Sequence, residues 1–339
     1  MGQFPVLFDA NSLKPIPTIN SKFITGLGQK EGMANVGESR DESLVGDRHL
    51  FCTELDQLMG YYDKLSPMDF FTLVHVAYEK TLKNEGKKST IFYHIHNPDG
   101  YAKLNFLRYN PEARIVMMIR EPLQNCESWV KHHFDSNDYN KVSTRIIAML
   151  YGIDQIVFRI QDSVGLRLED LKTHPQETMA SLCDWMEIEE QQSLYEMTAQ
   201  GKKWWGDPSS PDYGDKGMSP FGDSSIKRSV GSVFSEKDQF VLRTLFYPFS
   251  VRFGYIEEDL VGFKRDLQQI RPLLDEMFDF EKKMAQEPKV DLELFTRSGS
   301  YRYFRAGLVD RWKVLNEIND YPHMLTPLKI NTKANRPLA

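Results

Sequence analysis

The chain has 339 residues, of which 41% are hydrophobic and 27% are charged, and a formal net charge of -6. This is the composition of an ordinary globular protein with enough apolar side chains for a sizeable core. The acidic balance argues against a general nucleic-acid or membrane-surface binder, and no apolar run approaches the length of a membrane span. Three widely spaced cysteines predict neither a disulfide framework nor a zinc site and favour a reducing, cytoplasmic setting.

The N-terminal part of the chain contains one clear helix signal. Residues 1–48 are rich in Gly, Pro, Asn and Ser, and we expect them to be mostly irregular. The segment 66–86 predicts a helix, because Ser66 is a plausible N-cap and Asp69 stands at the capping-box position. Gly86 is the expected C-terminal stop.

From residue 89 the pattern alternates between strands and helices. We expect β-rich runs at 89–100, 115–119 and 164–171, and helices at 101–109, 122–134, 141–160 and from 174–175 onward. Strands that alternate with helices predict an α/β fold with a central parallel sheet flanked by helices. The apolar run 115–119 predicts a strand that is buried on both faces.

The C-terminal half begins with a long polar stretch at 200–232, which is either a functional or a flexible loop. We expect Trp204 and Trp205 to anchor this loop rather than to stack on a ligand. A helix is expected at 235–250. Further predictions are a charged helix at 256–286, interrupted by Pro272, and a loose tail at 324–339. The predicted organisation is an irregular segment 1–48, an α/β domain 49–255 and a helical extension with its tail at 256–339.

Arg120 comes directly after the apolar strand and is the first candidate for chemistry. Ligands of parallel sheets bind beyond the carboxyl ends of the strands, and a helix that starts at Pro122 would offer free backbone N–H groups to an anion there. The guanidinium fork suits phosphate. Ser128 could reach the same anion if the helix lies alongside it. The alternative is an arginine that forms an ion pair with Glu121 or Glu127.

Two histidines and a basic pair complete the candidate site. His96 ends the neighbouring predicted strand, with His94 on the same face, and a histidine beside an anion site is a candidate general base. The alternatives are hydrogen bonding to loop backbone and a metal pair, for which no third ligand is evident. Lys227 and Arg228, before Gly231, could close over a phosphate or remain a solvated pair.

Together these residues resemble the motifs of the sulfotransferase family, whose donor is 3'-phosphoadenosine 5'-phosphosulfate (PAPS). Arg120, Pro122 and Ser128 match the family's Arg-x-Pro with a serine eight residues after the arginine. The run HIHNP at 94–98 resembles Lys-x-His-x-Pro, with histidine in place of lysine. The segments 165–188, 226–233 and 253–255 resemble a strand-helix unit, the late basic-glycine loop and a closing Phe-Gly-Tyr.

The resemblance covers roughly residues 50–255 and implies a P-loop-like sulfotransferase fold. It implies that His96 takes the proton of an acceptor hydroxyl or amine, and that Arg120, Ser128, Lys227 and Arg228 hold the 3'-phosphate of PAPS. No metal is expected. We expect the acceptor to be a small molecule or a glycan. Lipid and peptide tyrosine also stay open, because acceptor pockets are built from variable loops.

The family's first motif, a glycine-rich loop for the 5'-phosphosulfate, has no match in this sequence. We interpret its nearest candidate, KFITGLGQKEGM at 22–33, as a surface loop, and we expect the chain to start after the true loop. Two alternatives therefore stay open. One is a nucleotide-binding or interaction module of the same fold without catalysis. The other is a P-loop phosphotransferase, which is weakened by the lack of Gly-x-x-x-x-Gly-Lys-Ser/Thr.

Overall fold

The structure, a computed structural model, describes residues 8–9, 14–15, 36–44, 46–84, 86, 88–92, 106–152, 162–208, 210, 213–286, 291–317 and 325–330. The chain divides into two compact units. The first takes in residues 1–113 and 190–222, and the second takes in residues 114–189 and 223–337. These units differ from the three segments that the sequence predicted, which were divided at residues 48 and 255.

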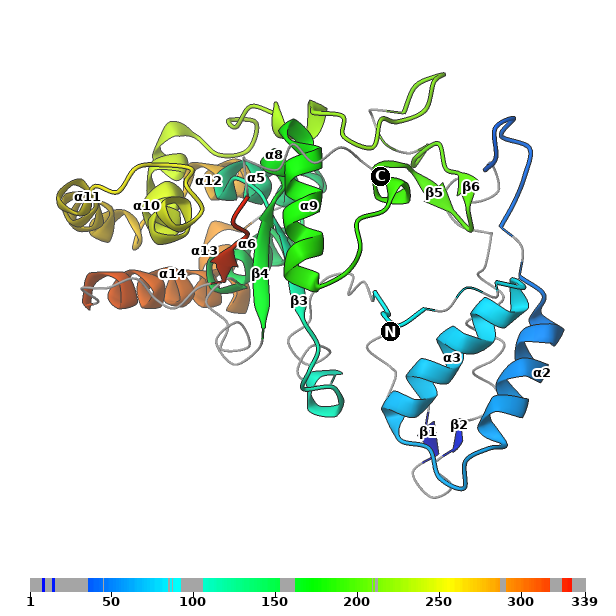
Figure 1. Ribbon diagram of the computed structural model, residues 1–339. Coiled ribbons are helices and arrows are strands. Elements are labelled where there is room, and N and C mark those ends of the chain that lie inside the picture. The colour runs from blue at the N-terminus through cyan, green and yellow to red at the C-terminus, as the bar shows by residue number, and fades with distance from the viewer. Residues whose placement is uncertain are drawn as a thin grey trace. The chain divides into compact units, whose positions relative to one another are not determined.

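A pair of helices forms the core of the first unit. Helices α2 (Arg48–Met59) and α3 (Pro67–Thr81) lie side by side and bury Phe51, Leu55, Leu65, Phe70, Leu73 and Ala77 between them (Figure 1). The predicted capping box is confirmed: the Ser66 hydroxyl accepts from the Asp69 N–H at 3.1 Å, and the Asp69 carboxylate accepts from the Ser66 N–H at 3.0 Å. The predicted stop at Gly86 is wrong. Lys83 adopts a φ of 55°, and the helix has already ended.

The tryptophan pair joins the polar stretch of the first unit to residues 36–37. Strands β5 (Thr198–Ala199) and β6 (Lys202–Lys203) form a short antiparallel hairpin, and η2 (Gln192–Tyr195) precedes it. Trp204 makes a β-bridge with Val36, and the Trp205 indole N–H donates to the Gly37 carbonyl at 2.7 Å. A separate pair, β1 (Phe8–Asp9) and β2 (Lys14–Pro15), is also antiparallel.

The second unit contains a parallel sheet, so the α/β prediction holds in its coarser form. Strands β3 (Ile115–Ile119), β4 (Ser163–Arg167) and β7 (Thr326–Pro327) pair in the order β3-β4-β7, all parallel. The register between β3 and β4 brings Ile119 opposite Arg167. The predicted strand 164–171 is too long, because β4 ends at Arg167 and helix α8 (Leu168–Thr173) follows at once.

Two sequence predictions about this sheet are wrong. Strand β3 is not buried on both faces, since Met118 is 49% exposed whereas Ile119 is 3% exposed. The segment 325–330 is not a loose tail: β7 adds the third strand, Leu325 is fully buried, and the Leu328 N–H donates to the Gly165 carbonyl at 2.8 Å. A strand of two residues carries no periodicity from which it could have been predicted.

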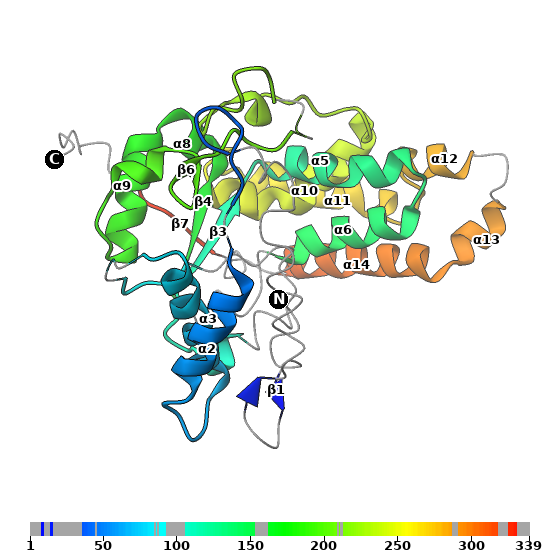
Figure 2. The same cartoon turned by 90° about the vertical axis from the view of Figure 1, so that its right-hand side faces the viewer.

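Helices cover both faces of the sheet, as Figures 1 and 2 show together. On one side α9 (Pro175–Met186) packs on β4 through Leu182, Val164 and Leu166. On the other side lie α5 (Pro122–Asp135), α6 (Tyr139–Gly152) and α10 (Glu236–Arg252). Helix starts at Pro122 and Pro175 agree with the predictions, since proline favours the first helical position.

The remaining helices join the same core. They are α11 (Leu260–Leu273), α12 (Asp279–Ala285), α13 (Leu292–Arg297) and α14 (Gly299–Glu317). Helix α14 packs on α6, and α11 packs on α10. The predicted helix 256–286 is therefore two helices, and Pro272 lies in the last turn of the first one.

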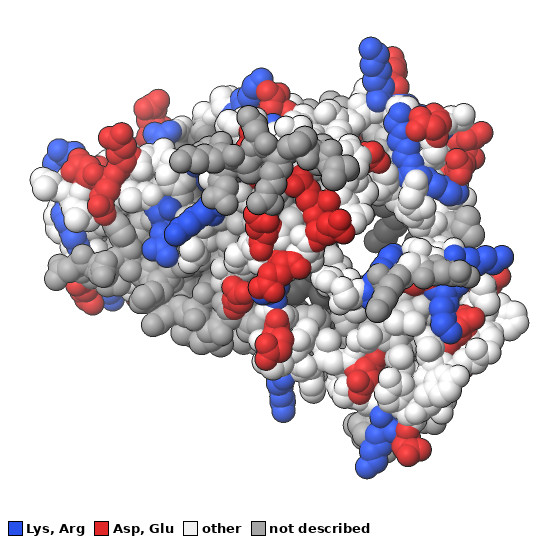
Figure 3. All heavy atoms as spheres, viewed as in Figure 1, with Lys and Arg blue, Asp and Glu red and all other residues white. Residues whose placement is uncertain are grey.

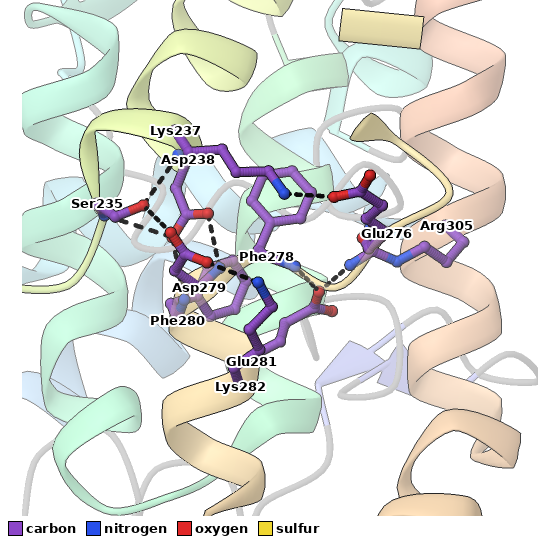
Figure 4. A network of polar contacts seen from close by, with 10 residues as sticks. All are labelled: Ser235, Lys237, Asp238, Glu276, Phe278, Asp279, Phe280, Glu281, Lys282 and Arg305. Atoms are coloured by element: carbon purple, nitrogen blue, oxygen red, sulfur yellow. Dashed lines mark hydrogen bonds and ion pairs between the residues drawn. The ribbon is translucent and has the colours of Figure 1, made fainter. Parts of the chain in front are cut away.

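Buried polar groups tie α10, α12 and α14 together (Figure 4). Asp238 is fully buried, and its carboxylate accepts from the backbone N–H groups of Asp279 at 2.8 Å and Phe280 at 3.0 Å. Glu281, also fully buried, accepts from the Tyr139 hydroxyl at 2.5 Å and from the Arg305 guanidinium. Burial raises the pKa of both carboxyl groups, although these donors oppose the shift.

Charges of both signs are mixed on the face drawn in Figure 3. Several charged side chains of the described residues are paired, as in Lys202 with Glu42 at 2.8 Å and Lys203 with Glu38 at 3.2 Å. This mixture fits the small net charge of the sequence.

Candidate anion-binding site

The site lies where β3 passes into α5 in the second unit. Glu121 is the N-cap of α5, and its carboxylate accepts from the Gln124 N–H at 2.5 Å. Its own N–H donates to the Glu169 carboxylate at 2.9 Å. The Gln124 N–H, one of the helix donors that the sequence predicted to be free for an anion, is therefore already occupied by a side chain of the protein.

Arg120 keeps its positive charge without an ion-pair partner among the described residues. Its Nε donates to Gln124 Oε1 at 2.9 Å, and its Nη2 donates to the Ser225 carbonyl. Both acceptors are neutral. The alternative from the sequence, an ion pair with Glu121 or Glu127, is not formed: no described carboxylate lies within 4.0 Å of this guanidinium.

Arg228 approaches the same place from the loop between η3 (Ser224–Ile226) and α10. Its Nη1 donates to the Ser128 hydroxyl on α5 at 3.4 Å. Burial lowers the pKa of Arg120, and the nearby charge of Arg228 lowers it further. The carboxylates of Glu169 and Glu121 act on Arg120 in the opposite direction and raise its pKa, but they do not cancel the lowering. Two cations that act on each other in this way can both donate to a bound anion. Ser128 and Arg228 are both exposed, so a ligand can reach them.

Gln124 connects the strand end with the loop, and the sequence did not single it out. Its Oε1 accepts from Arg120, while its Nε2 donates to the carbonyls of Ile226, at 3.3 Å, and Arg228. One amide side chain therefore positions both arginine-bearing segments. Glutamine is one of the few side chains that can accept and donate in this way at once.

Glu127 is the second residue that sequence reasoning misjudged. It is 4% exposed, and its carboxylate accepts from the backbone N–H groups of four consecutive residues, Gly231 to Phe234, at 3.0–3.2 Å. The Ser232 hydroxyl adds a fifth donor at 2.8 Å. Burial alone would raise the pKa of Glu127, but these donors outweigh it and the pKa is lowered.

A second group of contacts joins the ends of β4 and α10 to this site. The Tyr255 hydroxyl donates to Glu169 at 2.8 Å, and the Arg167 guanidinium lies 4.6 Å from the centre of the Tyr255 ring. Glu169 also holds the Glu121 N–H. Parts of four of the segments that carry the sequence resemblance, 120–128, 165–188, 226–233 and 253–255, are therefore in contact, whereas the fifth, 94–98, lies outside the described residues.

The other candidates are placed differently. The Lys227 ammonium pairs with Asp223 on its own turn and does not join Arg120, Ser128 and Arg228. His94 and His96 lie outside the described residues. Cys126 is fully buried, and burial raises the pKa of its thiol, which suits a packing role.

Within the described ranges, no group of three or more His, Cys, Asp or Glu side chains could hold a metal ion. No described helix is long and apolar enough to cross a membrane. A search of protein families, curated proteins and solved structures found no match to the chain. The geometry of the site and the sequence motifs thus carry the functional argument.

Proposed function

We propose that the chain binds the 3'-phosphate of PAPS through Arg120, Ser128 and Arg228 and transfers the sulfonate group to an acceptor hydroxyl or amine. The observation that carries the proposal is a pair of contacts at the carboxyl end of β3: Arg228 donates to the Ser128 hydroxyl, and the Gln124 side chain joins Arg120 to the Arg228 backbone. Arg120, Ser128 and Arg228 come from a strand end, a helix and a loop 100 residues further along the chain. Two arginines that only served solubility on the surface would not need to be held together by contacts between such distant segments.

The proposed reaction is an in-line displacement at sulfur. The acceptor oxygen or nitrogen forms a bond to sulfur, the bond from sulfur to the bridging phosphate oxygen breaks, and adenosine 3',5'-bisphosphate leaves. His96 takes the acceptor proton. The cations at Arg120 and Arg228 hold the nucleotide in place, which fixes the distance and the angle between the reacting atoms. We also propose that the parallel sheet and its helices belong to the P-loop-like sulfotransferase fold.

The direct test is transfer of a labelled sulfonate from PAPS to a panel of alcohols, amines and glycans. Adenosine 3',5'-bisphosphate should inhibit by competition. His96→Ala should abolish transfer while the affinity for adenosine 3',5'-bisphosphate, measured by calorimetry, stays within about threefold. A chain that binds ATP with Mg²⁺ but not the bisphosphate would overturn the proposal in favour of a phosphotransferase.

A catalytically silent nucleotide-binding module is the second candidate function. It is favoured by one observation: the sequence contains no match to the glycine-rich loop that should hold the 5'-phosphosulfate. Such a module would bind adenosine 3',5'-bisphosphate and would transfer no sulfonate to any acceptor in the panel.

A further inference from the structure

The loop that carries Arg228 is fixed on both sides of that residue. Upstream, Arg120 and Gln124 hold the carbonyls of residues 225, 226 and 228. Downstream, the Glu127 carboxylate holds the N–H groups of 231–234. Only Ser229 and Val230 lie between the two sets of contacts. The backbone that carries the Arg228 side chain is therefore held from both directions.

The downstream contact requires a carboxylate. Five N–H and O–H donors point at the two oxygens of Glu127, and a carboxylate can accept all of them because it carries no hydrogen of its own. An amide of the same size would turn an NH₂ group toward backbone N–H groups. Gly231 adopts a φ of 127°, which lets the backbone turn so that successive N–H groups converge.

We infer that Glu127 is a positioning residue of the anion site: it shapes the loop 226–234 so that Arg228 lies against Ser128 beside Arg120. The role of the loop in binding nucleotide rests on the proposed function. The shaping of the loop does not, because it follows from contacts within the chain itself. The two parts can therefore be tested separately.

Glu127→Gln is the central variant, and Asp135→Asn is its matched control. Asp135 lies on the same helix but is 54% exposed and forms an ion pair with Lys131 at 3.1 Å. Hydrogen exchange without added nucleotide measures how well the backbone amides of the loop are protected. In Glu127→Gln the amides of 231–234 should exchange at least about tenfold faster than in the wild type, whereas Asp135→Asn should match the wild type.

Calorimetry then measures how the substitution changes the affinity for nucleotides. Glu127→Gln should bind adenosine 3',5'-bisphosphate about tenfold more weakly and adenosine 5'-monophosphate with unchanged affinity. A general loss of protein stability would instead weaken the affinity for both nucleotides by a similar factor. If Glu127→Gln does not fold, Ser232→Ala removes the hydroxyl donor alone and should shift both measurements in the same direction by a smaller factor.

Unchanged exchange at 231–234 in Glu127→Gln would overturn the inference. It would also be overturned if exchange accelerates while the preference for the bisphosphate stays at its wild-type value. A wild-type chain that binds neither nucleotide would instead sink the proposed function, and the exchange experiment alone would then decide whether Glu127 shapes the loop.

Discussion

Lys227 and Arg228 are neighbours in the chain, yet their side chains have separate partners. The Lys227 ammonium pairs with Asp223 one turn earlier, whereas Arg228 donates to the Ser128 hydroxyl on α5 at 3.4 Å. Of the two adjacent cations, only Arg228 extends the cluster that Arg120 begins. A basic dipeptide therefore has one member in the candidate site and one in a local ion pair.

This difference predicts unequal effects of two adjacent alanine substitutions. Arg228→Ala should weaken binding of adenosine 3',5'-bisphosphate by about 10- to 100-fold, since it removes a charge-assisted contact to phosphate. Lys227→Ala should change the affinity by less than about threefold, because exposed ion pairs contribute little. Calorimetry on both variants measures this. Equal losses would contradict the assignment.

The stability contributed by Glu127 should depend on pH in a defined direction. Its pKa is lowered in the folded chain from an ordinary value of 4.5. Its contribution is therefore fully present above that value and is lost as pH falls through the lower folded pKa. Denaturant unfolding of the wild type and Glu127→Gln should show the largest difference in the free energy of unfolding near neutral pH. A difference that grows on acidification would refute this.

The capping box of α3 should be worth a measurable amount. Ser66→Ala removes the hydroxyl that accepts from the Asp69 N–H, and we expect a loss of about 1 kcal/mol in the free energy of unfolding. Nucleotide affinity should not change, since Ser66 belongs to the first unit. Urea denaturation measures the loss. An unaltered midpoint would show that the cap is not formed in solution.

The buried Glu281 should matter far more than an exposed glutamate in the same unit. Glu281→Ala leaves the Tyr139 hydroxyl, the Phe278 N–H and the Arg305 guanidinium without this acceptor, and it should cost about 3–5 kcal/mol. Glu293→Ala breaks an ion pair with Arg297 that is 68% exposed on the glutamate side, and it should cost at most about 1 kcal/mol. Thermal denaturation compares the stability of the two variants. Similar losses of stability in both would argue against the buried network.

Gly165 allows close packing on the central strand. A Cβ at this position would lie 2.6 Å from the Phe253 ring and 3.0 Å from the Leu325 side chain. Gly165→Ala should therefore lower the free energy of unfolding by about 1–3 kcal/mol through overpacking. Gly201→Ala is not a suitable control because of its positive φ, whereas Gly152→Ala meets no atom within 4 Å. A stabilised Gly165→Ala would show that Phe253 and Leu325 do not pack against Gly165.

Local signals in the sequence predicted where several helices begin. Ser66 with Asp69, and Pro122 and Pro175 at helix starts, act within a single turn and are readable from neighbouring residues alone. The strand end at Arg120 also follows from a local apolar run. Strand β7 could not be predicted, because its two residues become a strand only by pairing with β4, which is about 160 residues earlier in the chain.

The role of Glu127 was hidden for a similar reason, since its donors lie 104–107 residues away. One signal could have revealed it. Leu123, Cys126, Glu127 and Val130 occupy the helical stripe that is buried in α5. A carboxylate in an apolar stripe needs several donors, and a glycine-containing loop is a natural source of them.

The contribution of the 3'-phosphate to binding tests the central claim most directly. Calorimetry at one fixed ionic strength would compare adenosine 3',5'-bisphosphate with adenosine 5'-monophosphate on the wild-type chain. If Arg120, Ser128 and Arg228 hold that phosphate, the bisphosphate should bind at least about tenfold more tightly, and Arg228→Ala should remove most of the difference. Equal affinities of the two nucleotides for the wild type would contradict the claim.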